Sequence, residues 1–413
     1  MKKTLLSVIL CATIVQADVF EITVVNGTNN QEFTESFTAV EDTFNTMDVD
    51  AIKERIGYSE TDNITANVDF RGLPMELTYA GGTTDLVLSV PSIGITETFS
   101  GATRDDSVDM FEDWLKENGA DAVEKIMKKL AEVSPSDPIA GNPNSIMSTS
   151  VAKDFDAGFT QVATKQASAA VTSGTSSSAN SISITPSYSA LDVDGVDSTS
   201  YFVPLAYSFN FDRDINEKVI ISIPISYTDV EGSKSASLGF GLAYAKPLNS
   251  DWTLTPAIGY GATGSADLGS LAQVASFSLT SSYAWELDND YTLSMGNMVG
   301  YYSSVKFYSG DYAYDPGISN TVYRNALMLN VPTNAIVNNT SVELFAIDTR
   351  FTGSALYLEE YQEYGLSYGY DLINVNLLSD SEKYSVRRSL KIGFSYLSSD
   401  KADGFKVNFG YVF

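Results

Sequence analysis

The C-terminal half of the chain repeats one pattern, in which aromatic or aliphatic residues alternate with small or polar residues. Near the C-terminus, for example, Phe405, Val407 and Phe409 alternate with Lys406 and Asn408. Successive side chains of a β-strand point to opposite faces, so each stretch makes a strand with one apolar and one small or polar face. A soluble sandwich would instead expose Lys, Glu and Arg on its second face. The pattern therefore predicts strands with lipid on one side and a lumen on the other.

About twelve such stretches can be counted, and most have the ~9–11 residues that a tilted strand needs to cross a bilayer. They are 181–189, 200–211, 218–228, 234–246, 251–262, 272–286, 290–302, 321–331, 340–350, 359–375, 384–398 and 403–413. An even number is typical of bacterial single-chain barrels, and only a closed sheet satisfies every backbone group in hydrocarbon. We predict an all-β transmembrane barrel of about 12 antiparallel strands, preceded by a small α+β soluble domain. The alternative is a soluble β-rich adhesion protein.

The N-terminus has the pattern of a secretory signal. Two lysines at Lys2 and Lys3 precede an apolar run of about eleven residues, which is too short to span a bilayer. Small residues before position 18 predict cleavage after Ala17, so that residues 1–17 are a signal peptide. The only cysteine, Cys11, would be removed with it. Export without disulfides favours a bacterial envelope.

At this point the chain resembles the outer-membrane β-barrel proteins of Gram-negative bacteria. The resemblance covers about residues 181–413 and rests on the Lys-Lys signal, the aromatic alternation and the C-terminal Phe409, Tyr411 and Phe413. An alternating stretch that closes on a C-terminal Phe resembles the signal that barrel-insertion machinery reads. The resemblance thus implies an outer-membrane location, with lipid and that machinery as partners. Twelve strands after an N-terminal region are also similar to the translocator domain of autotransporters, although a long repeated passenger is missing here.

Residues 18–147 are predicted to form a separate, acidic α+β domain. Residues 18–150 contain 25 acidic and 8 basic residues, a net charge of −17. Apolar stripes at helical spacing predict helices at Asp105–Asn118 and Ala120–Val133. A β-meander is predicted between Ile64 and Phe99, because short alternating stretches are separated there by Gly- and Pro-containing turns.

Residues 148–180 are rich in Ser, Ala and Thr, which is typical of a linker. Its first half, Val151–Ala170, carries a weak apolar stripe and could form a helix. Two interpretations remain open for this segment. It is either a solvated periplasmic linker or a plug inside the barrel.

Composition excludes several kinds of chemistry. The chain has no His and no Cys beyond Cys11, so a Ser-His-Asp triad, a Cys-His pair and a His- or Cys-ligated metal site cannot be built. The net charge of −27 opposes binding to phosphate backbones, so we expect no nucleic-acid partner. We predict no enzyme activity, no cofactor, and no catalytic, cofactor-binding or metal-binding residues. The oligomeric state is not readable from the sequence.

Basic residues on the inward face of the last strands give the sharpest site hypothesis. The alternation places Arg387, Lys391 and Lys406 inside, and Arg324 on the eighth strand is a further candidate. Inward charges tune the selectivity of open barrels, so a basic strip would favour anionic solutes. Alternatively, these side chains would pair with Asp154 and Asp156 if the helix of the linker lies in the lumen.

The working function is a non-enzymatic one. The barrel acts as a narrow pore or transport channel, or as a membrane anchor for its N-terminal domain. The first alternative is an autotransporter-like translocator, in which residues 18–147 are carried outside the cell. If Phe413 lies on the periplasmic side, the longest connection, Ser303–Asn320, falls outside.

Overall fold

The computed structural model describes two connected parts, an N-terminal domain and a barrel. The described residues are 19–46, 49–117, 120–160, 180–211, 217–309, 312–333, 336–372 and 388–412. The predicted signal peptide and two predicted site residues, Arg387 and Phe413, lie outside this part of the chain.

The C-terminal part is a closed antiparallel barrel of twelve strands, which confirms the predicted fold class. Thr185 and Pro186 divide the first strand into two pieces, and both pieces pair with the last strand to close the sheet. The strands are β7 (Ser181–Ile184) with β8 (Ser187–Val193), β9 (Val196–Asn210), β10 (Lys218–Val230), β11 (Ser233–Pro247), β12 (Trp252–Ser265), β13 (Ser270–Glu286), β14 (Thr292–Val305), β17 (Ser319–Pro332), β18 (Thr340–Gly353), β19 (Glu360–Leu372), β20 (Arg388–Ser398) and β21 (Ala402–Val412). A short hairpin, β15 (Phe307–Ser309) and β16 (Tyr312–Tyr314), lies between β14 and β17, and η2 (Asp288–Asp290) lies between β13 and β14.

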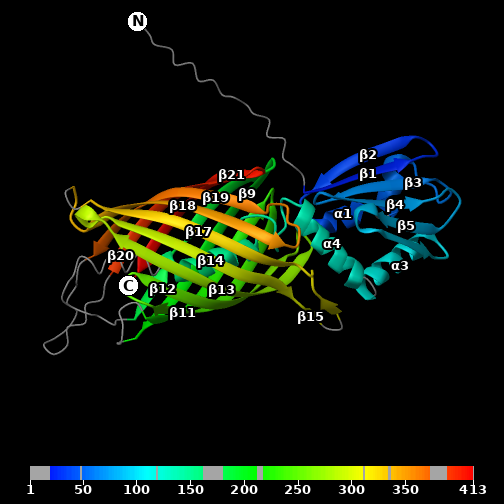
Figure 1. The fold of residues 1–413 in the computed structure, drawn as a ribbon. Coiled ribbons are helices and arrows are strands. Elements are labelled where there is room, and N and C mark those ends of the chain that lie inside the picture. The colour runs from blue at the N-terminus through cyan, green and yellow to red at the C-terminus, as the bar shows by residue number, and fades with distance from the viewer. Residues whose placement is uncertain are drawn as a thin grey trace, which may run out of the picture.

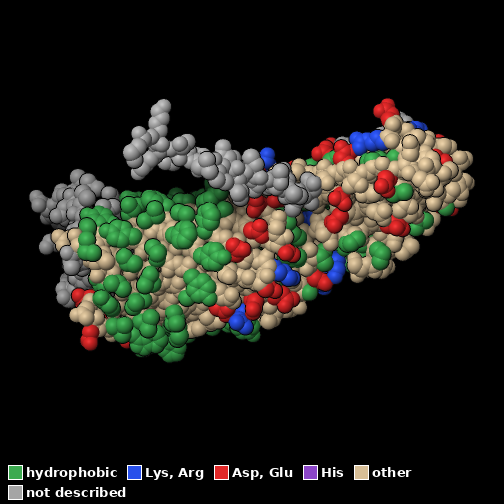
Figure 2. Space-filling model, turned by 90° about the horizontal axis from the view of Figure 1, so that it is seen from above, with side chains coloured by type: hydrophobic (Ala, Val, Ile, Leu, Met, Phe, Trp, Pro, Cys, Tyr) green, Lys and Arg blue, Asp and Glu red, His purple; other side chains and the backbone are tan. Residues whose placement is uncertain are grey.

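Large apolar side chains cover the outer surface of the barrel, and Figure 2 shows them as a band over the part farthest from the N-terminal domain. Phe277 is 58% exposed and Ile392 is 54% exposed. Exposed aromatic residues also gather at both edges of the band. Trp252, Trp285 and Tyr291 lie at one edge, and the other edge carries Tyr201, Tyr227, Tyr260, Tyr301 and Tyr323. A band of this kind between two aromatic girdles is typical of a lipid-facing barrel surface.

The N-terminal domain is an antiparallel sheet with helices packed against it. The sheet has the order β2-β1-β3-β4-β5-β6, and α3 packs against β5 and β6. Its elements are β1 (Phe20–Asn26), β2 (Gln31–Phe37), α1 (Val40–Thr46), α2 (Val49–Ile56), β3 (Ile64–Phe70), β4 (Leu73–Tyr79), β5 (Asp85–Val90), η1 (Pro91–Ile93), β6 (Ile95–Ser100), α3 (Arg104–Glu117) and α4 (Ala120–Val133). The predicted meander and both predicted helices are present. The first two strands and the first two helices had not been predicted.

The domain caps one end of the barrel, as Figure 1 shows. We call this end the domain mouth. The opposite end, where β7 begins and β21 ends, is the terminal mouth. The chain passes between the two ends through α5 (Ile146–Gly158), which contacts β10, β11, β12, β13 and β14. Among the described residues, no helix is both long enough and apolar enough to cross a membrane.

Candidate functional site

Helix α5 lies in the lumen against one wall of the barrel, formed by β10 to β14. The Ser145 side chain accepts a hydrogen bond from the Ser148 amide at 3.3 Å and so caps the helix. The helix therefore begins five residues before the predicted start at Val151, and it crosses the predicted domain boundary between residues 147 and 148. Of the two interpretations left open for the linker, the lumenal one holds for residues 146–158.

Small side chains on the lumen face of this wall allow the helix to approach closely. A Cβ added to Gly259 would lie 2.5 Å from the Lys153 Nζ, and one added to Gly296 would lie 2.5 Å from the Phe159 ring. A Cβ at Gly241 would lie 2.8 Å from the same ammonium. A real Cβ atom essentially never lies within 3.0 Å of a neighbouring heavy atom, so a larger residue at these positions would force something to move. The alternation of Gly with Leu and Tyr in the sequence therefore has a structural reason, since the glycines make a notch for α5.

A buried polar network fixes α5 to the barrel. Lys153 and Asp154 are 5% and 2% exposed, and the Lys153 Nζ lies 2.9 Å from Asp154 Oδ1. The second carboxylate oxygen accepts hydrogen bonds from the hydroxyls of Ser276, at 2.9 Å, and Tyr302, at 3.0 Å. Buried charges are stable only when paired and hydrogen-bonded, and each oxygen of Asp154 has such a partner. This network sets the position of the helix in the lumen.

The opposite wall, formed by β17 to β21, carries charged side chains. The Arg324 guanidinium donates to Glu363 Oε2 at 2.6 Å and also to the Thr349 hydroxyl. Across β19, the Lys391 ammonium on β20 lies 2.6 Å from Glu343 Oε1 on β18. The Arg324 guanidinium also lies 5.4 Å from the centre of the Phe155 ring on α5. This wall is therefore lined with ion pairs, where the other wall is lined with small residues.

The structure places the predicted lumen charges inside but changes their expected role. Arg324, Lys391 and Lys406 face the lumen, whereas Asp154 binds Lys153, Ser276 and Tyr302 in place of those cations. Asp156 points into the space between α5 and the charged wall. The predicted basic strip did not include the glutamate partners that Arg324 and Lys391 have in the structure. At the C-terminus, Phe409 is 45% exposed, on the lipid-facing side of β21.

Glu343, Glu363 and Tyr302 had not been predicted as site residues. The alternation did contain a signal for Glu363, which lies on the same face of its strand as Tyr361 and Gly365. For Glu343 the signal was hidden, because Val342 to Ile347 reads as an almost continuous apolar run. In the structure Phe345 and Ile347 point inward and pack against the cluster that contains Phe155 and Phe159. Because these inward residues pack near the helix, they are apolar like the outward ones. The strand therefore does not alternate in sequence, and its inward glutamate could not be recognised.

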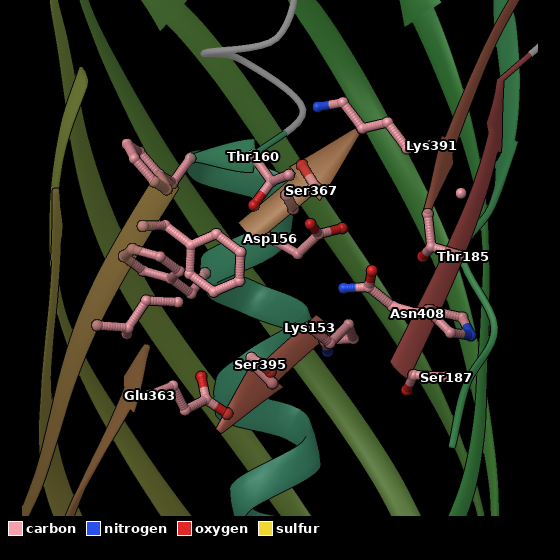
Figure 3. Close-up of a pocket in the computed structure, with 18 of the residues that line it drawn as sticks. Lys153, Asp156, Thr160, Thr185, Ser187, Glu363, Ser367, Lys391, Ser395 and Asn408 are labelled. Carbon is pink, nitrogen blue, oxygen red and sulfur yellow. The ribbon is translucent and has the colours of Figure 1, made fainter. Parts of the chain in front are cut away.

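A cavity of about 210 Å³ lies between α5 and the charged wall (Figure 3). Phe155, Phe159 and Phe345 form part of its lining, and Lys406 and Asn408 lie on another side. Figure 3 shows Asp156 projecting from α5 toward Asn408. Near the terminal mouth the lining reaches Ser183 and Gly410, within three residues of the ends of β7 and β21.

The domain mouth is sealed by the segment between α4 and α5. Ile139 and Ala140 of this segment and Met147 of α5 are fully buried, and they share a cluster with Leu356 and Leu358 from the β18–β19 loop. Backbone hydrogen bonds also hold this segment to the β18–β19 loop. The Tyr357 amide donates to Ala131 O at 2.8 Å, and the Leu358 amide donates to Gly141 O at 3.1 Å. Gly141 has φ of +87°, and a Cβ there would collide with the Ala131 carbonyl.

Arg71 joins three segments at this mouth. Its guanidinium donates to Asp137 Oδ2 at 2.8 Å, to Leu268 O at 3.0 Å and to the Ser270 hydroxyl at 2.7 Å. Both side chains of the Arg71–Asp137 pair are fully buried. Burial raises the pKa of Asp137 and lowers the pKa of Arg71, while the attraction between them opposes both shifts. The domain is thus held to the β12–β13 loop by hydrogen bonds from an arginine that also forms a buried ion pair with Asp137.

The comparisons with known proteins concern the barrel. No protein-family model matches the sequence, and no curated protein matches it. The β-domain of the Bordetella autotransporter BrkA is 14% identical with a TM-score of 0.41, over 57% of this chain and 99% of its own. The translocator domain of the autotransporter NalP from Neisseria meningitidis is 13% identical with a TM-score of 0.42, over 65% and 97%. An outer membrane channel from Pseudomonas putida F1 is 12% identical with a TM-score of 0.39, over 58% and 96%. The solved structures that this chain is similar to thus include two translocator domains and one channel.

Proposed function

We propose that this protein is an outer-membrane barrel that displays its own N-terminal domain on the cell surface. One observation carries the proposal. The domain caps one mouth, the barrel strands begin and end at the other, and α5 runs between them inside the lumen. Whichever way the barrel is inserted, the chain runs through the lumen between the domain at one mouth and the first barrel strand at the other. A translocated domain requires this path, whereas a domain anchored beside the barrel does not.

The orientation follows from the C-terminal strand. In the outer-membrane barrels that this chain resembles, insertion machinery in the periplasm recognises an alternating C-terminal strand that ends on Phe. Strand β21 has that pattern, and its Phe405, Val407 and Phe409 face outward. The terminal mouth then faces the periplasm, and the domain mouth faces the outside. The position of the apolar band agrees, because it leaves the charged barrel surface nearest the domain to project from the bilayer (Figure 2).

Labelling of single cysteines on intact cells tests the proposal. The chain has only Cys11, inside the predicted signal peptide, so a new cysteine would be the sole thiol of the mature protein. Glu97→Cys lies on an exposed strand of the domain, and Asp288→Cys lies on the exposed β13–β14 turn at the terminal mouth. A membrane-impermeant maleimide should label Glu97→Cys on intact cells and label Asp288→Cys only after the outer membrane is breached. The reverse result would place the domain in the periplasm and end the proposal.

A narrow channel is the second candidate function, and the cavity beside α5 favours it. The glycine-lined wall is filled by the helix, but the charged wall is separated from it by about 210 Å³ of space. Steady currents through the full-length protein in planar bilayers would support a channel. Currents that appear only after deletion of residues 146–158 would show that the helix closes the pore, as expected for a display protein after export.

A further inference from the structure

Three connections between barrel strands contribute apolar side chains to the N-terminal domain. Leu268, in the β12–β13 loop, is fully buried and shares a hydrophobic cluster with Phe20 of β1. Tyr314 on β16 packs against the main core of the domain, and Leu358 in the β18–β19 loop shares a cluster with Ala131 of α4. The core of the domain therefore includes residues that belong to the barrel and lie far away in the sequence.

Hydrogen bonds hold two of these connections in place against the domain. The amide of Val40, at the start of α1, donates to the carbonyl oxygen of Asp267 in the β12–β13 loop at 2.8 Å. Arg71 adds two hydrogen bonds to the same loop. After β16, the Asp315 amide donates to Glu124 Oε1 on α4 at 3.2 Å. These bonds fix the loop backbone as well as side chains, so the loops and the domain determine each other's positions.

We propose that the barrel supplies part of the core of the N-terminal domain, so that the domain folds only when it is seated on the domain mouth and closes that mouth as it folds. The rings of Phe20 and Phe70 lie 5.0 Å apart, and Leu268 belongs to the cluster against which they pack. Without the loop, this apolar surface would face water. Domains have little net stability, and the loss of one large buried side chain removes much of it. Closure follows because α4 leads directly into the segment that seals the mouth.

Trypsin digestion of the full-length protein in detergent tests whether the domain depends on these loops. Leu268→Ala should raise the rate at which the domain is cut by about 30-fold or more, because truncation of a buried leucine shifts the balance toward the open form by at least that factor. Tyr314→Ala should act in the same direction. The matched control is Leu248→Ala, which changes a 48% exposed leucine at the terminal mouth and should leave the rate unchanged. Heat-modifiable migration in gels checks that each barrel is intact. A domain that resists trypsin equally in the wild type and in both loop variants would overturn the proposal.

A thiol in the seal tests whether folding and closure are one event. Ser136 lies between α4 and α5 and is 3% exposed, and Ser136→Cys would be the only thiol apart from Cys11. A water-soluble maleimide should label it slowly, and adding Leu268→Ala should speed labelling by about the same factor as trypsin cleavage, whereas adding Leu248→Ala should not. A thiol that stays protected while the domain is cut would contradict the coupling of folding to closure. Neither assay depends on which mouth faces the periplasm, so failure here is separate from failure of the display proposal.

Discussion

The two walls of the lumen differ both in what they face and in the side chains that line them. The wall of β10 to β14 is lined with Gly, Ser, Ala and Thr, and a helix fills the space that these small residues leave. The rings of Phe155 and Phe159 reach from the helix toward the wall of β17 to β21, which carries Arg324, Glu363, Glu343 and Lys391. A wall that packs against a helix needs small side chains, because these let the helix approach closely. A wall that borders an open cavity has to neutralise its own charged side chains, and it does so with ion pairs between strands.

The largest effect should come from breaking an ion pair of the charged wall. Arg324→Met leaves the Glu363 carboxylate buried without its guanidinium partner, and such a change costs about 3–5 kcal/mol of unfolding free energy. Urea unfolding of the protein in lipid vesicles measures the loss. The double variant Arg324→Met with Glu363→Gln should regain most of it, because no buried charge is then left alone. A single variant as stable as the wild type would show that this pair is not buried in the lumen of the folded barrel.

A smaller effect is expected at the contact between the helix and its wall. Tyr302→Phe removes the hydroxyl that donates to Asp154, and a hydrogen bond to a charged group contributes about 1.5–3 kcal/mol. The loss should appear as a lower urea midpoint. Tyr301→Phe, on the lipid-facing side of the same strand, is the matched control and should leave the midpoint unchanged. Equal losses for the two variants would mean that Asp154 does not depend on Tyr302.

A large side chain introduced into the wall of small residues should clash with the helix that packs there. Gly296→Leu would press on the rings of Phe155 and Phe159, and overpacking of this kind costs about 1–3 kcal/mol. We expect α5 to leave its place and the current in planar bilayers to increase. Gly369→Leu is the control on the charged wall, because a Cβ there would lie 3.4 Å from its nearest neighbour, Lys391. If only the control variant increased the current, the helix would lie against the wall of β17 to β21 and not against the wall of β10 to β14.

The sequence predicted the lipid-facing side better than the lumen. Every strand needs apolar side chains at its lipid-facing positions, so Leu, Phe and Tyr recur with period two. The strands could therefore be located within a few residues. The lumen has no such common demand. Gly241 and Gly259 are small because Lys153 lies against them, and that contact joins residues almost a hundred positions apart. The strand β2 was missed for a related reason, because it is an edge strand whose side chains are exposed or half-buried and mostly polar.

The smallest effect is expected for an ion pair of the same chemistry on the outside of the barrel. Arg350 pairs with Asp348 and Glu360, as Arg324 pairs with Glu363, but the Arg350 side chain is 57% exposed. Water screens both members of such a pair, so their attraction contributes little to folding. Arg350→Met should therefore leave the urea midpoint within experimental error of the wild type. If Arg350→Met destabilised the barrel as much as Arg324→Met, burial could not be the cause of the Arg324 effect. The contrast between the lumen pair and the surface pair would then have to be explained by strand pairing, since β18 and β19 are neighbours in the sheet and both contribute to the Arg350 cluster.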